Sequence, residues 1–336
     1  MNKVCVVGDL HFKSELSYSA SIKDGRRSEW EDIKRTIFNT AKDCSEIVLM
    51  GDNLNARNNT SAVLKEFVEF LKEFGDKPVH ILVGNHERQG ETTALDFLKK
   101  INYPNWNIYT NITENVNLVG KKATFVPWIT PALIGVETIE QVKEKLSKLP
   151  KADISFFHHA IAGTEGTEFF NEVVIDQSSL KSGMTFGGHI HKPQKLTDNI
   201  IVTGSVITAE VGEHKKSIWV WDGDTNNVDE IPLPVRGIYK INWDESVDMK
   251  KVLNQIPAKS ITKCIVTNTK TVMTLVKDSV KGFDSVLIVE QYPNEREKID
   301  YGEDGLDLSI DSLLKLYAKS KEIKYSDLKE GFELIK

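Results

Sequence analysis

Five short segments of the sequence place aspartate, histidine and asparagine next to short apolar runs. Carboxylate, amide oxygen and imidazole are the ligands that divalent cations such as Mn²⁺ take in proteins, and no cysteine pair accompanies them. One carboxylate can also bridge two cations in a two-metal hydrolytic site. The segments therefore predict a divalent metal centre. They are Gly8-Asp9-Leu10-His11, Gly51-Asp52-Asn53, Gly84-Asn85-His86-Glu87, His158-His159 and Gly187-Gly188-His189-Ile190-His191.

The apolar runs beside these segments are typical of strands in a layered α/β domain. Residues 28–44 and 60–74 have apolar side chains at helical spacing, the first after Ser28 as an N-cap. Because the carboxyl ends of neighbouring strands meet at one edge of an α/β sheet, we expect the five segments to lie in one crevice. The predicted strands are residues 3–7, 46–50, 79–83, 123–127, 153–157 and 199–203.

Each segment alone is weak evidence, since Asp-x-His, Gly-Asp-Asn and Gly-Asn-His all occur in ordinary turns. Their occurrence together, in this order and next to hydrophobic strands, is what predicts the metal centre. The order D-x-H, G-D-x, G-N-H-D/E, H and G-H-x-H resembles the calcineurin-like metallophosphoesterase superfamily. The stretch from Gly204 to Glu210, with Gly212 and Glu213, resembles the G-S-x-x-x-x-x-x-G-E segment of its DNA-repair nuclease branch, typified by bacterial SbcD and its archaeal, eukaryotic and phage counterparts.

The resemblance implies an α/β fold, a layered β-sandwich flanked by helices, with a small α+β capping domain and a C-terminal helical tail. It also implies two Mn²⁺ ions, with Mg²⁺ as the alternative, that share Asp52 as a bridging ligand. His158 is preferred to His159 because it follows its strand directly, as the family's histidine does. The implied ligands are Asp9, His11, Asp52 and His191 for one ion, and Asp52, Asn85, His158 and His189 for the other.

The resemblance assigns His86 a catalytic role: facing the scissile phosphate, it would stabilise developing charge and help to protonate the leaving oxygen. Two positions depart from the nuclease pattern. Asn55 is the second candidate catalytic residue: it stands where that branch has another catalytic histidine, and the exchange leaves the strength of exonuclease activity open. Glu87 replaces the commoner Asp after the catalytic histidine.

Six basic residues near the metal segments are candidates for contacts with DNA phosphates, which position a nucleic acid without reading its sequence. The alternative for each is a solvated surface charge. Trp106, Trp128 and Trp219 are interpreted as core or rim packing rather than base-stacking platforms. The basic candidates are Lys13, Arg26, Arg27, Arg57, Arg88 and Lys192.

Two prolines near residues 232–234 mark a predicted domain boundary. Residues 1–235 would form the nuclease domain and residues 236–293 a capping, DNA-binding domain. Residues 294–336 would form a charged linker and two amphipathic helices, 309–319 and 325–334. These helices either dock on their own domain or bind a partner. The partner implied by the resemblance is an SMC-like coiled-coil ATPase.

Composition limits the setting of the protein. The 336 residues include three widely spaced cysteines, which form neither a disulfide framework nor a thiolate zinc site. No apolar run approaches the ~20 residues that span a bilayer, and no signal-peptide core opens the chain. We expect a cytoplasmic protein of a bacterial cell or phage-infected host, without a membrane partner, and by resemblance a homodimer. The net charge of −6 offers no overall basic field for nucleic acid.

The expected function is a Mn²⁺-dependent DNA nuclease, a 3′–5′ double-strand exonuclease and single-strand endonuclease. It would act in an SMC-like ATPase complex in DNA end processing, repair or recombination. One alternative is a metallophosphoesterase for nucleotides or phosphoproteins, whose site would be identical because fold and metals do not choose the substrate. The other is a mainly structural subunit that tethers DNA ends, for which Asn55 leaves room.

Overall fold

The structure is a computed structural model that describes residues 2–13, 15–19, 24–165, 172–243, 249–257, 259–267, 286–291, 318 and 324–326. The chain divides into two compact units, Met1–Gln291 and Tyr292–Lys336. The elements below belong to the first unit. The predicted helices 309–319 and 325–334 lie almost entirely outside the described residues.

The first sheet has six strands in the order β16-β15-β1-β2-β3-β6. Its parallel part runs from β1 to β6, and β15 joins the other side of β1 in the antiparallel direction. A segment from late in the chain thus completes the sheet that the N-terminus begins. The strands are β1 (Lys3–Val7), β2 (Glu46–Leu49), β3 (Val79–Leu82), β6 (Trp106–Tyr109), β15 (Ser217–Asp222) and β16 (Val228–Pro232).

The second sheet also has six strands, in the order β13-β14-β12-β9-β8-β7. Its four central strands are parallel, and each edge strand pairs antiparallel with its neighbour. The strands are β7 (Thr113–Leu118), β8 (Lys121–Val126), β9 (Ile154–Phe157), β12 (Met184–Gly187), β13 (Gln194–Thr197) and β14 (Ile200–Val202).

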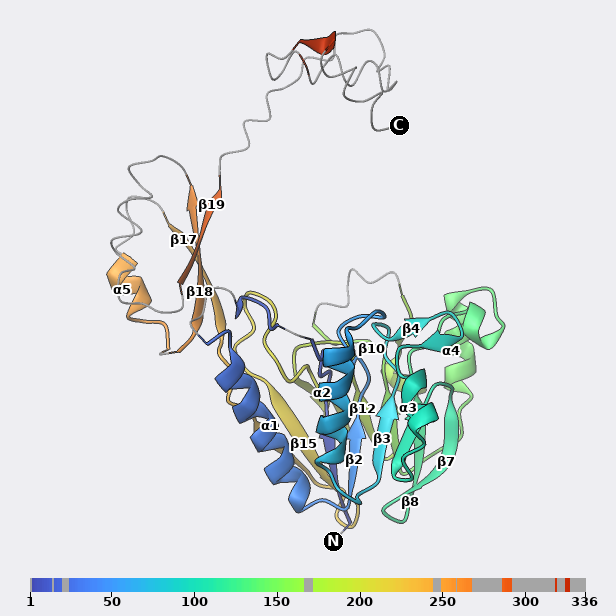
Figure 1. Cartoon of the computed structure of the whole chain (residues 1–336). Helices are drawn as coiled ribbons and strands as arrows, with labels where there is room; N and C mark the ends of the chain where they lie inside the picture. The colour runs from blue at the N-terminus through green and yellow to red at the C-terminus, as the bar shows by residue number, and fades with distance from the viewer. Residues whose placement is uncertain are drawn as a thin grey trace. The chain divides into compact units, whose positions relative to one another are not determined.

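The two sheets pack face to face with helices on their outer faces (Figure 1). β1 is apolar on both faces, so both are covered: Val4 and Val6 lie in the core between the sheets, whereas Cys5 and Val7 face the helices. The first sheet is covered by α1 (Arg27–Lys42), α2 (Ser61–Lys72) and α3 (Asp96–Ile101). The second is covered by α4 (Ile139–Ser147). The predicted layered α/β fold is confirmed.

The starts of the first two helices differ from each other. Thr60 caps α2 by accepting a hydrogen bond from the backbone N–H of Val63. In α1 the N-cap is Arg26, in a left-handed conformation with φ 60°, and its side chain makes no capping bond in the described structure. Ser28 lies inside α1, where its hydroxyl bonds the side chain of Asp24. The prediction of Ser28 as the N-cap is therefore wrong.

A separate three-stranded parallel sheet follows residue 237, with the order β17-β18-β19. It consists of β17 (Ile238–Trp243), β18 (Ile261–Thr267) and β19 (Val286–Gln291), with α5 (Met249–Leu253) between the first two strands. Residues 268–285, between β18 and β19, lie outside the described residues. The domain boundary at residue 235 stays a prediction.

Short elements complete the described chain. The two-stranded ribbons are β4 (Arg88–Gln89) with β5 (Thr92–Thr93), and β10 (Ala160–Ile161) with β11 (Val174–Ile175). Single 3₁₀ turns cover Ala132–Ile134 and Gln177–Ser179. Within the part of the chain that the structure describes, no helix is both long and apolar enough to cross a membrane.

Candidate metal centre

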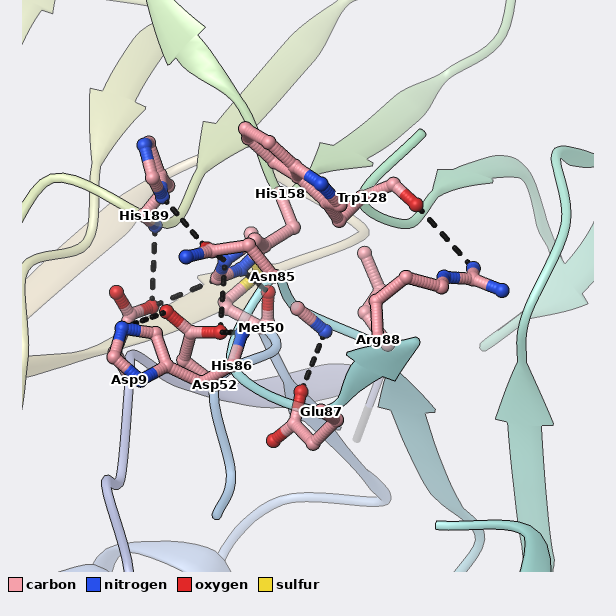
Figure 2. Close-up of polar contacts among 12 residues, drawn as sticks. Asp9, Met50, Asp52, Asn85, His86, Glu87, Arg88, Trp128, His158 and His189 are labelled. Atoms are coloured by element: carbon pink, nitrogen blue, oxygen red, sulfur yellow. Dashed lines mark hydrogen bonds and ion pairs between the residues drawn. The ribbon is translucent and has the colours of Figure 1, made fainter. Parts of the chain in front are cut away.

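The seven predicted ligands converge from five loops, each of which leaves the carboxyl end of a parallel strand. The strands are β1, β2 and β3 of the first sheet, and β9 and β12 of the second. Figure 2 shows side chains from both sheets pointing toward one another. In each of three groups of residues, the candidate ligand atoms of that group lie within 4.8 Å of one another. They are Asp9, His11 and His191; His11, Asp52 and His86; and Asp52, His158 and His189.

One half of the cluster is formed by Asp9, His11 and His191. The Nε2 atoms of His11 and His191 lie 2.9 Å apart. Two nitrogen ligands at right angles around one first-row ion, each about 2.1 Å away, would lie about 3.0 Å apart. Asp9 Oδ2 is buried without a hydrogen-bond partner among the residues described. A divalent cation would satisfy that oxygen, so this donor set fits a metal.

The other half is formed by Asp52, Asn85, His158 and His189. His158 donates its Nδ1–H to the carbonyl of Met50 over 2.7 Å, so its Nε2 faces the cluster. That Nε2 lies 3.1 Å from Asn85 Oδ1 and 3.4 Å from Asp52 Oδ1, which are both acceptors. His189 Nδ1 lies 2.9 Å from the same Asn85 oxygen. This convergence of acceptors also fits a divalent cation.

Burial controls the protonation of the cluster. Burial raises the pKa of Asp9 to about 8 and lowers the pKa of His11 to about 3. Burial would also lower the pKa of His158, but the charge of Asp52 and its hydrogen bond raise that pKa to about 10. The same His158 interaction outweighs burial at Asp52 and holds the pKa of that carboxyl well below its usual range. The buried carboxylates thus require positive charge beside them.

Three of these residues adopt the left-handed backbone conformation, with φ 46° at His11, 45° at Asp52 and 75° at His189. For residues other than glycine this conformation costs about 1–3 kcal/mol each, and it persists only where the surroundings hold it. The backbone N–H of His11 donates to Asp52 O over 2.8 Å, and that of His189 donates to Asp9 Oδ1 over 3.2 Å. The cluster therefore holds its own loops in a strained conformation.

Gly84 brings two of the loops into contact. A Cβ atom at this position would lie 2.1 Å from Asp52 Oδ1 and 2.2 Å from the Asp52 backbone nitrogen. Neither of these two Asp52 atoms tolerates that approach, because real Cβ atoms do not come closer than about 3 Å to other heavy atoms. Glycine at this position is what lets the loop after β3 pack against the loop after β2.

Glu87, which departs from the family pattern, connects the same two loops by hydrogen bonds. Its buried carboxylate accepts the backbone N–H of Leu54 over 2.7 Å and that of Gly84 over 2.6 Å. Burial raises the pKa of Glu87 to about 8. The side chain holds the loops from beneath the cluster, and it belongs to none of the three groups of candidate ligands.

His86 lies at the exposed side of the cluster, with 40% of its side chain accessible. Its Nδ1–H donates to the backbone carbonyl of Asn55 over 2.8 Å. That bond leaves Nε2 unprotonated in the neutral ring, 3.8 Å from Asp52 Oδ2. Asn55, predicted as a catalytic side chain, thus contacts His86 through its main chain. The catalytic roles of both residues stay predictions.

His159 is separated from the cluster. Its Nε2 accepts the backbone N–H of Ile129 over 3.2 Å, and its ring stacks on Trp128 with the centroids 4.9 Å apart. Burial lowers its pKa to about 3, so the ring is neutral. Trp128 also packs 5.0 Å from the ring of His189. The tryptophan interpreted from sequence as core or rim packing therefore contacts a candidate ligand.

Two of the six basic candidates are buried. Arg26 uses its five N–H donors within the protein: two on Glu29, two on Thr208 and one on the carbonyl of Ser17. Arg88 is 5% exposed and donates to the carbonyls of Thr110 and Trp128. Neither guanidinium faces solvent, so the prediction that Arg26 and Arg88 contact DNA phosphates is wrong.

The other four basic candidates stay predictions. Arg27, Arg57 and Lys192 are exposed, and Lys192 forms an ion pair with Glu165. Lys13 is half-buried and donates to the hydroxyl of Ser17 over 3.2 Å.

The chain is similar to known proteins both in sequence and in structure. No curated protein matches the chain. Among solved structures, TT1561 of Thermus thermophilus matches 69% of this chain and 99% of its own, at 12% identity and a TM-score of 0.39. Residues 2–193 match the calcineurin-like phosphoesterase family, and this range includes all seven predicted ligands. The chain belongs to the calcineurin-like metallophosphoesterase family, whose members are hydrolases that use divalent metals.

Proposed function

We propose that the protein is a Mn²⁺-dependent DNA nuclease, a 3′–5′ double-strand exonuclease and single-strand endonuclease. In this proposal it is the nuclease subunit of an SMC-like ATPase complex in DNA end processing, repair or recombination. The observation that carries the hydrolase part is that Asp52 belongs to two of the three groups, with His11 and His86 in one and with His158 and His189 in the other. A carboxylate in this position can bridge the two cations of a two-metal phosphodiester hydrolase.

The nuclease part is supported by residues 204–213, the stretch that resembles the nuclease branch. This stretch is built into the candidate centre. The backbone N–H of Val206 donates to Asp9 O over 3.0 Å, and that of Ser205 donates to His191 O over 3.0 Å. Glu213 accepts from the buried Lys216, which also donates to His191 O over 2.7 Å. The resembling stretch therefore supports the loops that carry two predicted ligands.

The predicted metal ligands and His86 would have separate roles in hydrolysis. Asp9, His11, Asp52 and His191 would hold one cation, and Asp52, Asn85, His158 and His189 the other. When bound, the cations supply Lewis acidity that activates water and neutralises phosphate oxygens. His86 would orient toward the phosphate, and its doubly protonated ring would transfer the Nε2 proton to the leaving oxygen, because its Nδ1–H is already donated to Asn55 O.

A cavity of about 1150 Å³ reaches the cluster at His11 and is also lined by Lys13 and Arg27. Both basic residues would contact the backbone of a nucleic acid that enters this cavity. Acidic side chains, among them Glu31 and Glu66, line the same cavity. Since the chain carries a net charge of −6, we expect weak DNA binding at physiological salt unless cations or a partner add positive charge.

The C-terminal segment, residues 294–336, would bind the SMC-like coiled-coil ATPase, and the active protein would be a homodimer. Both parts of the proposal rest on the resemblance and on the amphipathic pattern of this segment.

Purified full-length chain incubated with 3′-labelled duplex, hairpin and single-stranded DNA tests the proposal. Reactions contain Mn²⁺, Mg²⁺ or EDTA, with and without the ATPase, beside p-nitrophenyl phosphate and a nucleotide as competing substrate classes. Cleavage of DNA that depends on Mn²⁺ supports the nuclease. Hydrolysis of the small phosphoesters with intact DNA supports the nucleotide or phosphoprotein phosphoesterase instead. DNA binding without any hydrolysis supports the tethering subunit.

A further inference from the structure

His189 is held at both ring nitrogens. Its Nδ1 lies 2.9 Å from Asn85 Oδ1, inside the cluster (Figure 2). Its Nε2 lies 2.6 Å from Glu172 Oε1, on the side away from Asn85. Glu172 belongs to none of the five segments, and its side chain is 24% exposed. It reaches His189 from the residues that lead into β11.

The Glu172 contact selects one tautomer of His189. A carboxylate accepts hydrogen bonds and donates none when ionised, so Nε2 must carry the proton. Nδ1 then presents its lone pair toward Asn85 Oδ1, 2.9 Å away, and two acceptor atoms at this separation are satisfied when both bind one cation. The opposite tautomer would place the Nε2 lone pair against a carboxylate oxygen at 2.6 Å.

Two further contacts of His189 fix its place without choosing the tautomer. The backbone N–H donates to Asp9 Oδ1 and holds the residue at φ 75°. Trp128 packs against the imidazole with the ring centroids 5.0 Å apart and the planes 37° apart. In His158 the tautomer is selected by a backbone carbonyl, that of Met50, which accepts the Nδ1–H. At His189 the accepting group is the side chain of Glu172, so substitution can remove it.

We propose that Glu172 is a positioning residue for the divalent cation at His189, which accepts the Nε2–H, fixes the ring and increases the basicity of Nδ1. Metal-binding histidines usually donate their second N–H to a carboxylate, a carbonyl or water, and loss of that partner typically weakens metal binding about 10–100-fold. This inference rests on the part of the proposed function that makes His189 a metal ligand, and it does not depend on DNA as the substrate.

The test compares Mn²⁺ binding by full-length wild type, Glu172→Ala and Glu172→Gln, measured by titration calorimetry and by the electron paramagnetic resonance signal of free Mn²⁺. We expect Glu172→Ala to bind one of two ions about 10–100-fold more weakly and the other with unchanged affinity. Glu172→Gln keeps an acceptor oxygen, so its loss should be intermediate. Glu165→Gln is the matched control, because Glu165 is an exposed carboxylate on the same connection, paired with Lys192.

Absorption of the Co²⁺-loaded proteins gives a second readout, since a change in ligand geometry at His189 should alter the visible bands of one site. Wild-type Mn²⁺ affinities in both Glu172 variants would overturn the inference. Equal loss of affinity for both ions, together with a lower melting temperature of the metal-free variant, would also overturn it, because this result indicates destabilisation of the whole fold. If wild type binds two ions but cleaves no DNA, the inference stands and the nuclease proposal fails. If wild type binds no Mn²⁺, both fail.

Discussion

Asp52 and His86 are connected twice: the backbone N–H of His86 donates to Asp52 Oδ1 over 2.9 Å, and the imidazole Nε2 lies 3.8 Å from Asp52 Oδ2. The candidate bridging carboxylate therefore fixes the residue that is expected to act on the substrate. The connection depends on Gly84, two residues earlier, where the chain passes against Asp52. The predicted metal ligand and the predicted catalytic residue are thus linked in the fold, and substitution of one imidazole would separate their roles.

His86→Ala should keep both metal ions and lose cleavage. The substitution retains the backbone N–H that bonds Asp52 and removes the ring that would transfer a proton, a contribution typically worth about 10²–10⁴-fold in rate. Mn²⁺ titration and cleavage of labelled DNA measure the two effects separately. His214→Ala, which alters an exposed histidine stacked on Tyr239, is the control. Full activity of His86→Ala would refute the assigned role.

Gly84→Ala should weaken metal binding although no ligand is changed. Its Cβ would lie 2.1 Å from Asp52 Oδ1, so either the Asp52 side chain or the loop after β3 must move. Calorimetric titration with Mn²⁺ should show weaker binding of both ions, because Asp52 is a predicted ligand of both. Gly75→Ala is a control for backbone strain alone: Gly75 has φ 63° and no atom within 4 Å of the added Cβ. Equal Mn²⁺ affinities in Gly84→Ala and wild type would contradict the packing argument.

Arg26→Met should destabilise the protein by about 3–5 kcal/mol, the typical cost of removing one partner from a buried ion pair. The substitution leaves the buried Glu29 carboxylate without the two bonds of 2.6 Å and 2.7 Å that Arg26 supplies. Urea denaturation measures the loss. Arg35→Met breaks the exposed pair with Asp32 and should change stability by no more than about 1 kcal/mol. Similar losses in the two variants would show that Arg26 is not a structural residue.

Glu46 should make stability depend on pH in the acid range. Burial would raise its pKa, but hydrogen bonds from His80 and from the backbone N–H of Val119 hold the pKa below the usual 4.5. Because the folded-state pKa is lower than the unfolded one, the contribution to stability is complete above pH 4.5 and is lost as the pH falls through the folded-state pKa. Glu46→Gln should flatten the fall in unfolding free energy below pH 4.5. The same slope in variant and wild type would remove this assignment.

Much of the fold follows from short-range pattern. The run KVCVV forms β1 over Lys3–Val7 as predicted, because the four consecutive apolar side chains of residues 4–7 suit a strand buried on both faces. The five polar segments come together because each ends a parallel strand, which is a property of the sheet rather than of any one residue. The placement of His158 next to β9, and of His159 against Ile129, follows the one-residue difference in their distance from the strand.

Other features depend on contacts that the sequence does not display. Charge alone places Arg26 at the surface, whereas its burial depends on Thr208, which lies 182 positions away in the chain. The pairing of β15 with β1 joins residues still farther apart in the chain, such as Lys3 and Asp222. Glu172 has no motif around it, and only the folded chain places its carboxylate beside His189. Local propensity also failed at Ser28, where the chain enters α1 through a left-handed Arg26 instead.

The central claim is that two divalent ions share Asp52. The most direct test is the Mn²⁺ stoichiometry of the purified full-length chain and of Asp52→Ala, with the sites located by anomalous scattering from Mn²⁺-soaked crystals. We predict two ions per chain in wild type, on either side of Asp52, and loss of both ions and of hydrolysis in Asp52→Ala. A wild-type chain without bound ions, or an Asp52→Ala chain that still binds two, would contradict the account.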